Sequence, residues 1–222
     1  MSREQLLRLT ESGVLIPDFS GVLISPEAEI EAGATIYPCT VIKGKSRICA
    51  GSAVGPCSLV ERSEIGAGSV INASQVYDSK IESGVSIGPF SHIRPNCHIK
   101  SQAHVGDFVE IKNSVIGEES HIAHLTYIGD SDIGQNVNFG CGCVTVNYDG
   151  AAKGRCFVGN DAFIGCNTNL IAPVKVGDRA YIAAGSTITE DVPDDALSIA
   201  RARQVNKEGR AAGRFVKVKK RN

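Results

Sequence analysis

Residues 24–48 read ISPEAEIEAGATIYPCTVIKGKSRI, and isoleucine returns at every sixth position of this segment. The six-residue step continues to Val60, slips by one residue at several later points, and runs on to Ile188. An α-helix does not place a six-residue period on one face, and an ordinary strand alternates by two. Glycine and other small residues fill the gaps, so the pattern predicts short strands separated by tight turns.

Three such units, about 18 residues, form one triangular coil, and successive coils stack at the ~4.8 Å spacing of neighbouring strands. Residues 24–188 therefore supply about nine coils. One aliphatic side chain per unit points into the prism and packs on its counterpart one coil away. The sequence thus predicts an all-β fold, a parallel β-helix built from hexapeptide repeats.

The composition agrees with this fold and excludes other classes. The 222 residues include 43 valines and isoleucines but only nine leucines, which disfavours a helical bundle because branched side chains suit strands. No apolar run approaches the ~18 residues of a membrane span. The N-terminus also lacks the apolar segment of a signal peptide. We therefore expect a cytoplasmic protein that makes no membrane contact.

The eight cysteines are expected to be reduced, small packing residues, with redox or metal roles as the alternatives. No C-x-x-C motif occurs, and the close pair Cys141 and Cys143 is too tight for the usual zinc spacing. His92, His98 and His104 follow one another at the six-residue step, so they fall on three different faces of the prism. The sequence therefore indicates no metal site within one chain.

Three segments are expected along the chain. Residues 1–20 resemble a short amphipathic helix that caps the open end of the β-helix. Residues 21–192 form the β-helix, interrupted at 146–157 by an aperiodic excursion loop whose Asp149-Gly150 marks a turn. Residues 193–222 form a C-terminal tail with a helix and a basic end.

The formal net charge of −1 conceals +8 on residues 201–222 and −9 on residues 1–200. The simplest interpretation is a solvated basic tail, including 214–222, and the alternative is that its first residues contact phosphate. Nucleic acid is not expected as a partner, because no base-stacking aromatic residues interleave the charges.

The segment 92–153 departs from the aliphatic pattern because it carries many polar and titratable side chains. Arg94 and Lys112 lie one full coil apart along the sequence, so they stack on one face as a cationic pair that a phosphate would neutralise. Two solvated surface cations are the alternative. His124 is the best candidate for a general base, because imidazole titrates near neutral pH. A surface or packing histidine is the alternative there.

Three motifs in this region carry a specific resemblance: HVGDFVEIK at 104–112, AHLTYIGD at 123–130 and NVNFGCGCVTVNYDG at 136–150. With IAAGSTI at 182–188 and QVNKEG at 204–209, they resemble the acetyltransferase half of a bacterial bifunctional family, glucosamine-1-phosphate N-acetyltransferase/N-acetylglucosamine-1-phosphate uridylyltransferase. The resemblance covers residues 10–210. It implies the left-handed β-helix of hexapeptide-repeat acyltransferases and a homotrimer.

The resemblance also implies a role for each matching residue. His124 would be the base that accepts a proton from the substrate amine, and Glu110 the carboxylate that orients it. The sugar phosphate would be held by Arg94, Lys112, Tyr127, Asn138 and Lys153. The cosubstrate acetyl-CoA would be held by Asn147, Tyr148, Cys166, Ala184 and Arg201.

Two features of the family's pocket bear on this assignment. The pocket lies between protomers, so we expect at least Lys153 or Arg201 to come from a second chain. Cys166 stands where the family usually has serine, and Cys141 and Cys143 replace the usual small residues. A thiol is a weaker hydrogen bonder than a hydroxyl, so the affinity for CoA is expected to differ.

The expected activity is transfer of acetyl from acetyl-CoA to the amine of glucosamine 1-phosphate, without a metal. The product would feed the synthesis of UDP-N-acetylglucosamine and of peptidoglycan precursors. With no glycine-rich nucleotide loop and no uridylyltransferase segment in these 222 residues, we expect the chain to acetylate but not to make the UDP-sugar.

Three alternatives stay open at the level of sequence. The first is the same chemistry on another amino-sugar phosphate, such as galactosamine 1-phosphate. The second is a non-catalytic scaffold subunit that partners a separate uridylyltransferase or other nucleotidyltransferase. The third and weakest is a zinc-dependent hydratase with its metal site between subunits.

Overall fold

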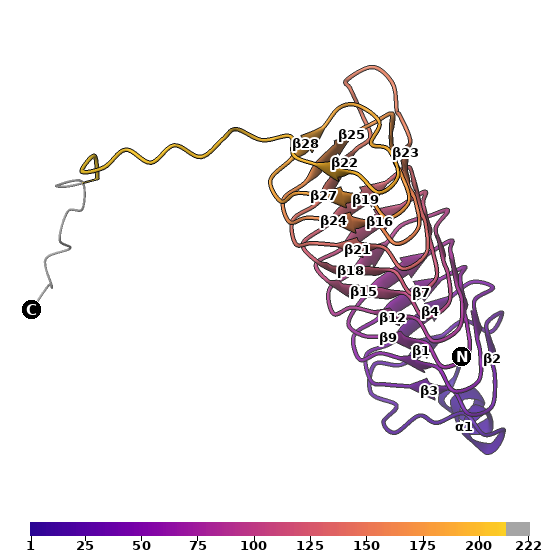
Figure 1. The fold of residues 1–222 in the computed structure, drawn as a ribbon. Helices are drawn as coiled ribbons and strands as arrows, with labels where there is room; N and C mark the ends of the chain where they lie inside the picture. The colour runs from indigo at the N-terminus through magenta and orange to yellow at the C-terminus, as the bar shows by residue number, and fades with distance from the viewer. Residues whose placement is uncertain (212–222) are drawn as a thin grey trace, which may run out of the picture.

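A computed structural model describes residues 1–211 and shows a left-handed parallel β-helix (Figure 1). Every strand pairing among these residues is parallel, and neighbours in a sheet come from successive coils. Over the described residues the three sheets hold ten, nine and ten strands, so nine complete coils are followed by a partial tenth. The predicted fold is therefore confirmed.

The strands of each sheet follow one another along the prism. The first sheet runs β1 (Leu23–Ile24), β4 (Val41–Lys43), β7 (Leu59–Glu61), β10 (Gln75–Tyr77), β13 (His92–Ile93), β16 (Glu110–Lys112), β19 (Tyr127–Gly129), β22 (Val144–Val146), β25 (Asn169–Ile171) and β28 (Thr187–Ile188). The second sheet runs β2 (Glu29–Ile30), β5 (Arg47–Ile48), β8 (Glu64–Ile65), β11 (Lys80–Ile81), β14 (His98–Ile99), β17 (Val115–Ile116), β20 (Ser131–Ile133), β23 (Cys156–Val158) and β26 (Val174–Val176). The third sheet runs β3 (Thr35–Ile36), β6 (Ala53–Val54), β9 (Val70–Ile71), β12 (Ser86–Ile87), β15 (His104–Asp107), β18 (His121–His124), β21 (Asn138–Phe139), β24 (Phe163–Ile164), β27 (Tyr181–Ile182) and β29 (Leu197–Ser198).

The core is the axis of the prism, where the periodic aliphatic side chains stack. Ile48 and Ile65 are fully buried and directly paired, although the sequence slips by one position between them. The slips of the sequence are therefore absorbed in the turns and leave the stacking intact. Each such side chain contributes about 1.5–3 kcal/mol by burial.

The turns at the corners of the prism bring non-glycine residues into the left-handed region. Phe108, Leu125 and Asp130 have φ of 56°, 47° and 47°. This conformation costs roughly 1 kcal/mol or more per residue, and the ladder hydrogen bonds to adjacent coils hold it. We call the corner between a third-sheet strand and the next first-sheet strand the 3/1 corner. The corner between the first and second sheets is the 1/2 corner.

The two ends of the prism differ. Helix α1 (Arg3–Glu11) begins at Ser2 with a capping box to Gln5 and buries Leu6 against the first coils (Figure 1). At the other end the tenth coil consists of β28, an isolated bridge at Val192 and β29. The chain beyond β29 runs away from the body (Figure 1). No helix occurs in 193–211, and the rest of the expected C-terminal helix and basic tail, 212–222, lies outside the described residues.

The excursion loop leaves the prism between β22 and β23 and rises as an arch beyond the last coils (Figure 1). An antiparallel bridge between Tyr148 and Lys153 closes it. Arg155 anchors its base through a bidentate pair with Asp132, with Nε 2.7 Å and Nη2 2.5 Å from the carboxylate oxygens. Among residues 1–211 the single helix is too short to cross a membrane.

Candidate active site

A column of five side chains follows the 3/1 corner through consecutive coils: Asp107, His124, Cys141, Cys166 and Ala184. Ladder hydrogen bonds connect each position to the next. At the ~4.8 Å strand spacing, the column from Asp107 to Ala184 is about 19 Å long. Three of its members, His124, Cys166 and Ala184, are residues that the sequence nominated for catalysis or for acetyl-CoA.

His124 and Asp107 form a hydrogen-bonded pair at the foot of this column. Nδ1 of the imidazole lies 2.6 Å from Oδ1 of Asp107, and the side chain of His124 is 59% exposed. The hydrogen bond from His124 lowers the pKa of Asp107, which keeps the carboxylate charged. A charged carboxylate on Nδ1 favours the tautomer with its proton there, so the lone pair of Nε2 is free to accept a proton.

Glu110 was expected to orient His124, and within one chain the structure places no hydrogen bond between these two side chains. The carboxylate of Glu110 lies 2.8 Å from Nη1 of Arg94 in an ion pair. The reason is the register: Glu110 opens a first-sheet strand beyond the 3/1 corner, whereas Asp107 is the direct ladder partner of His124. Within one chain Asp107 is therefore the carboxylate that is hydrogen-bonded to His124, and the orienting role of Glu110 stays a prediction.

A cationic cluster lies on the first sheet and the 1/2 corner. The ammonium of Lys153 lies beside that of Lys112 and, with partial burial and Arg94, lowers the pKa of Lys112. Two ammonium groups in contact repel each other unless an anion sits between them. A phosphate, with several acceptor oxygens, would satisfy both.

Asp130 lies beneath this cluster and is almost fully buried. It accepts hydrogen bonds from Nδ2 of Asn113, at 2.5 Å, and of Asn147. Burial opposes its charge, but these hydrogen bonds and the ammonium groups of Lys112 and Lys153 outweigh it, so its pKa falls below the usual value. Asp130 thus holds the base of the excursion loop next to the cationic cluster.

Tyr127 lies on the first sheet, as Lys112 of the cationic cluster does. A Cβ on Gly129 would clash with the hydroxyl oxygen of Tyr127 and would be only 2.8 Å from Nδ2 of Asn147. The tyrosine ring therefore folds over Gly129 towards Asn147. Any larger residue at position 129 would displace one of these two side chains.

The nominated residues fall into three groups. The first sheet and the 1/2 corner hold Arg94, Glu110, Lys112, Tyr127, Asn147, Tyr148 and Lys153. The 3/1 corner holds His124, Cys166, Ala184 and Arg201, whose side chain lies over Gly185. The third group is Asn138 alone, outward on the third sheet between His121 and Phe163.

This arrangement bears on the residues expected to hold acetyl-CoA and on the residues expected to come from a second chain. Within one chain Asn147 and Tyr148 are separated from Cys166 and Ala184 by the width of the first sheet, so the expected acetyl-CoA contacts do not converge. Lys153 and Arg201, of which at least one was expected from a second chain, each lie against their own chain, beside Lys112 and Gly185.

Asp107 and Asp130 were not among the residues predicted from the sequence. Asp107 precedes His124 by one slipped coil, so a search for carboxylates one coil from the candidate base would have found it. Asp130 ends the AHLTYIGD motif, but nothing in the sequence indicates that its carboxylate turns inward.

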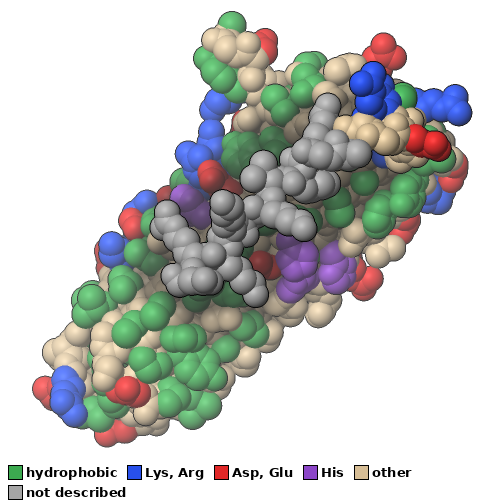
Figure 2. All heavy atoms as spheres, turned by 90° about the vertical axis from the view of Figure 1, so that its left-hand side faces the viewer, with side chains coloured by type: hydrophobic (Ala, Val, Ile, Leu, Met, Phe, Trp, Pro, Cys, Tyr) green, Lys and Arg blue, Asp and Glu red, His purple; other side chains and the backbone are tan. Residues whose placement is uncertain are grey.

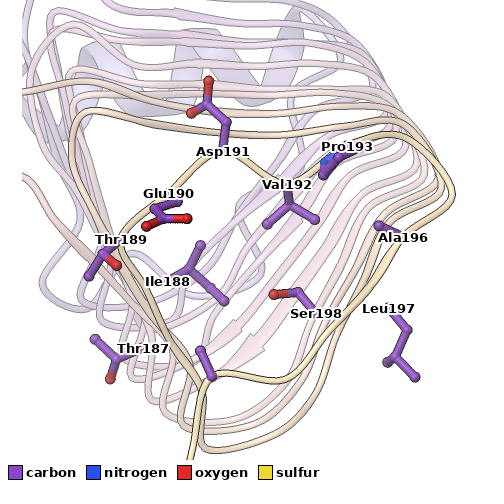
Figure 3. Close-up of a pocket in the computed structure, with 11 residues that line it drawn as sticks. Thr187, Ile188, Thr189, Glu190, Asp191, Val192, Pro193, Ala196, Leu197 and Ser198 are labelled. Carbon is purple, nitrogen blue, oxygen red and sulfur yellow. The ribbon is translucent and has the colours of Figure 1, made fainter.

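A separate hollow of about 270 Å³ lies at the open C-terminal end of the prism. Figure 3 shows Ile188 and Val192 at its centre, with Glu190 and Asp191 nearby. It lies four coils from His124 and does not include the nominated residues. In the part of the chain that the structure describes, no three His, Cys, Asp or Glu side chains are grouped to hold a metal ion.

Comparison with known proteins agrees with the coil pattern. The family model described as bacterial transferase hexapeptide (six repeats) matches residues 78–113 and 155–190. With the coils seen in the structure, this match defines the class: the chain carries the hexapeptide repeats that the family model describes.

Among curated proteins, the chain has high sequence identity to one kind of protein, the bifunctional protein GlmU. The chain is 53% identical over 196 residues to the bifunctional protein GlmU of Halalkalibacterium halodurans and 54% identical over 197 residues to that of Caldicellulosiruptor saccharolyticus. These alignments cover 88% and 89% of the chain but 43% and 42% of the relatives, so the chain spans less than half of their length. Among solved structures, the UDP-N-acetylglucosamine acyltransferase of Francisella novicida is 20% identical, with a TM-score of 0.47, over 84% of this chain and 67% of that one.

Proposed function

We propose that this protein transfers an acetyl group from acetyl-CoA to the amine of glucosamine 1-phosphate, in the cytoplasm and without a metal. The observation that carries the proposal is the His124–Asp107 pair at the foot of a column of small side chains. The identity of 53% and 54% to two GlmU proteins and the motifs around His124 support the choice of substrates. The product would be N-acetylglucosamine 1-phosphate, a precursor of UDP-N-acetylglucosamine.

His124 acts as the base in this proposal. Nε2 accepts a proton from the amine while the nitrogen attacks the thioester carbonyl, and Asp107 stabilises the imidazolium that forms. The tetrahedral intermediate carries an oxyanion, which a backbone N–H stabilises, and it collapses to expel the CoA thiolate. The imidazolium is then the acid that can return a proton to this thiolate.

The 3/1 column would receive the extended arm of acetyl-CoA. Cys141, Cys166 and Ala184 are small, so the corner above His124 is left open over about 14 Å of strand spacing. Arg201 lies at the upper end of the column, where its guanidinium suits a phosphate of CoA. This arrangement places a thioester near His124 when the phosphates are near Arg201.

The cationic cluster would receive the sugar phosphate. Arg94, Lys112 and Lys153 supply the positive charge, and phosphate binding relieves the repulsion between the two lysines. Tyr127 lies between this cluster and the 3/1 corner, where it can contact the sugar.

The protein is proposed to be a homotrimer. Phe90, Phe108 and Leu125 stack on consecutive coils at the 3/1 corner, each at least half exposed and each with positive φ. The rings of Phe90 and Phe108 are 5.4 Å apart, and hydrophobic side chains cover much of the face in Figure 2. A second copy of the chain would bury this ridge. Its excursion loop could then bring Asn147 and Tyr148 to the 3/1 corner.

Thiol release from acetyl-CoA tests the proposal. Purified protein is assayed with glucosamine 1-phosphate, with galactosamine 1-phosphate and with no sugar. Release that depends on glucosamine 1-phosphate, together with N-acetylglucosamine 1-phosphate as product, is expected. Preference for galactosamine 1-phosphate would change the substrate, and no release with either sugar would contradict the proposal.

A further inference from the structure

Cys141 and Cys166 belong to the column above His124, and Cys143 follows Cys141 two residues later. The proposed acetyl transfer uses no thiol of the protein. Cys166 is exposed, Cys141 is half-buried and Cys143 is buried. The Cys143 thiol lies 3.2 Å from the carbonyl oxygen of Gly165, and burial next to Cys166 and Cys141 raises its pKa to about 11. Cys143 is therefore an inert packing residue, whereas Cys141 and Cys166 can meet a ligand.

Cys141 and Cys166 are direct ladder neighbours on consecutive coils. The amide of Asn167 donates to the carbonyl of Cys141 over 2.8 Å, which fixes this register. Neighbouring Cα atoms on parallel strands are ~4.8 Å apart, within the range of about 4.4–6.8 Å that a disulfide spans, and the two Cβ atoms have to close from about the same spacing to ~3.5–4.5 Å when the bond forms. Sγ of Cys166 leans towards the coil of Cys141, since a Cβ on Gly140 would be only 2.8 Å from it. Glycine at position 140 leaves room for that sulfur.

We propose that Cys141 and Cys166 form a reversible dithiol pair inside the acetyl-CoA column, which a small disulfide oxidises by thiol–disulfide exchange. The effect on activity rests on the proposed function, whereas the formation of the disulfide does not. The favoured oxidant is CoA disulfide, because a column that leads the CoA sulfur to His124 brings it past both thiols.

The exchange has two steps. The exposed Cys166 thiolate attacks one sulfur of CoA disulfide, which forms a mixed disulfide and expels one CoA thiolate. The Cys141 thiolate then attacks the sulfur of Cys166 and expels the second CoA thiolate. His124, one coil from Cys141, is placed to take the Cys141 proton. Two protein thiols and one CoA disulfide thus give one protein disulfide and two CoA thiols.

Forming the protein disulfide would draw the two sulfurs to about 2 Å from each other and remove both S–H donors, which would distort the wall of the column. The disulfide would lie between Arg201 and His124, where the arm of acetyl-CoA has to pass. Oxidised protein would therefore not transfer acetyl, and a reducing thiol would restore the activity. The device would stop acetyl transfer when the CoA pool becomes oxidised.

The chain offers a matched control. Cys39 and Cys57 are also neighbours on consecutive coils of the 3/1 corner, and both are exposed. The coil of Cys57 lies four coils below that of His124, about 19 Å away by strand spacing. Oxidation of this second pair should leave the acetyl-CoA column open.

The experiment treats the reduced full-length protein with CoA disulfide or, in a second arm, with oxidised glutathione. Remaining thiols are then alkylated, and disulfides are mapped by peptide mass spectrometry. We expect a Cys141–Cys166 disulfide that forms faster with CoA disulfide, and an at least tenfold loss of acetyl transfer that dithiothreitol reverses. Excess acetyl-CoA should slow this disulfide without slowing a Cys39–Cys57 disulfide.

Variants separate the outcomes. The Cys141→Ala protein should keep its own reduced-state rate after CoA disulfide treatment, and the Cys39→Ala/Cys57→Ala protein should still be inactivated. Two results would contradict the proposed Cys141–Cys166 disulfide. In the first, Cys141 and Cys166 stay reduced while Cys39 and Cys57 are oxidised. In the second, only a stable CoA adduct forms on Cys166. If the protein with the mapped Cys141–Cys166 disulfide kept full activity, the proposed loss of acetyl transfer on oxidation would be wrong. A reduced protein with no activity would contradict the proposed function, while the mapping would still decide on the pair.

Discussion

At the scale of single residues, the hydrogen bond between His124 and Asp107 sets the state of the candidate base. It keeps a proton on Nδ1, and it provides a negative charge for the imidazolium of the reaction. The candidate base was identifiable from the sequence because the AHLTYIGD motif, which carries the family resemblance, singles out His124 among the five histidines of the coils. Its partner was not, because several carboxylates lie about one coil away and only the slipped register selects Asp107 over Glu110.

Replacing Asp107 tests this partnership. Asp107→Asn removes the charge but leaves an amide of similar shape, so the imidazole can take the wrong tautomer. We expect kcat to fall by about 10²–10⁴-fold with a small change in KM for acetyl-CoA. Glu110→Gln serves as the comparison, and an equal or larger loss of kcat there would return the orienting role to Glu110.

The lowered pKa of Asp130 implies that the stability of the folded protein depends on pH. Its pKa is below the ordinary value in the folded protein, so its charge stabilises the fold above the unfolded pKa of about 3.9. That stabilisation is lost as pH falls through the lower, folded pKa. We expect Asp130→Asn to have a lower Tm than the wild type at pH 7, with the difference shrinking below about pH 4. A difference that persists unchanged at low pH would show that the charge of Asp130 is not its cause.

At the scale of elements, the six-residue period predicts the coils well, because each aliphatic position needs only its counterpart one coil away. Ile48 and Ile65 stay paired across a slip, so the rule survives irregular turns. The excursion loop has no such period. Its conformation depends on Asp130, Asp132 and Arg155, whose contacts join residues from different coils. These contacts could not be predicted from local sequence.

Arg155 provides the test at this scale. Its guanidinium pairs with Asp132 and also donates to the backbone carbonyls of Asn113 and Ser131. We expect Arg155→Ala to speed amide hydrogen exchange in residues 147–154 severalfold, with little change in the coils before residue 100. The control is Arg179→Ala, an exposed pair with Asp195 that lies away from the loop. Unchanged exchange in the loop would mean that Arg155 does not anchor it.

At the scale of the whole molecule, one chain carries most of the candidate site residues at two corners of the prism and Asn138 apart from them on the third sheet. Asn147, Tyr148 and Lys153 lie at the 1/2 corner, and His124 and Cys166 lie at the 3/1 corner. All of these residues could be predicted as site residues from the motifs in which they occur. The sequence could not predict how they are divided among the faces, because that depends on where each residue falls within its coil.

If the proposed trimer buries the ridge of Phe90, Phe108 and Leu125, a charged residue in that ridge should dissociate it. Phe108→Asp places a carboxylate in the apolar ridge without touching the core, since the side chain is 54% exposed. We expect the mass measured by light scattering to fall from three chains to one, with most of the activity lost. Phe157→Asp, also exposed but on the second sheet, should stay trimeric. A wild-type protein that is already a monomer would contradict the proposed assembly.

We propose that His124 is the base for acetyl transfer to an amino-sugar phosphate. The most direct measurement compares kcat/KM for glucosamine 1-phosphate in the wild type, His124→Ala and His121→Ala, the last being an exposed histidine on the same strand. We expect a loss of about 10²–10⁴-fold for His124→Ala and a much smaller effect for His121→Ala. An unimpaired His124→Ala enzyme, or an equal loss in both variants, would contradict it.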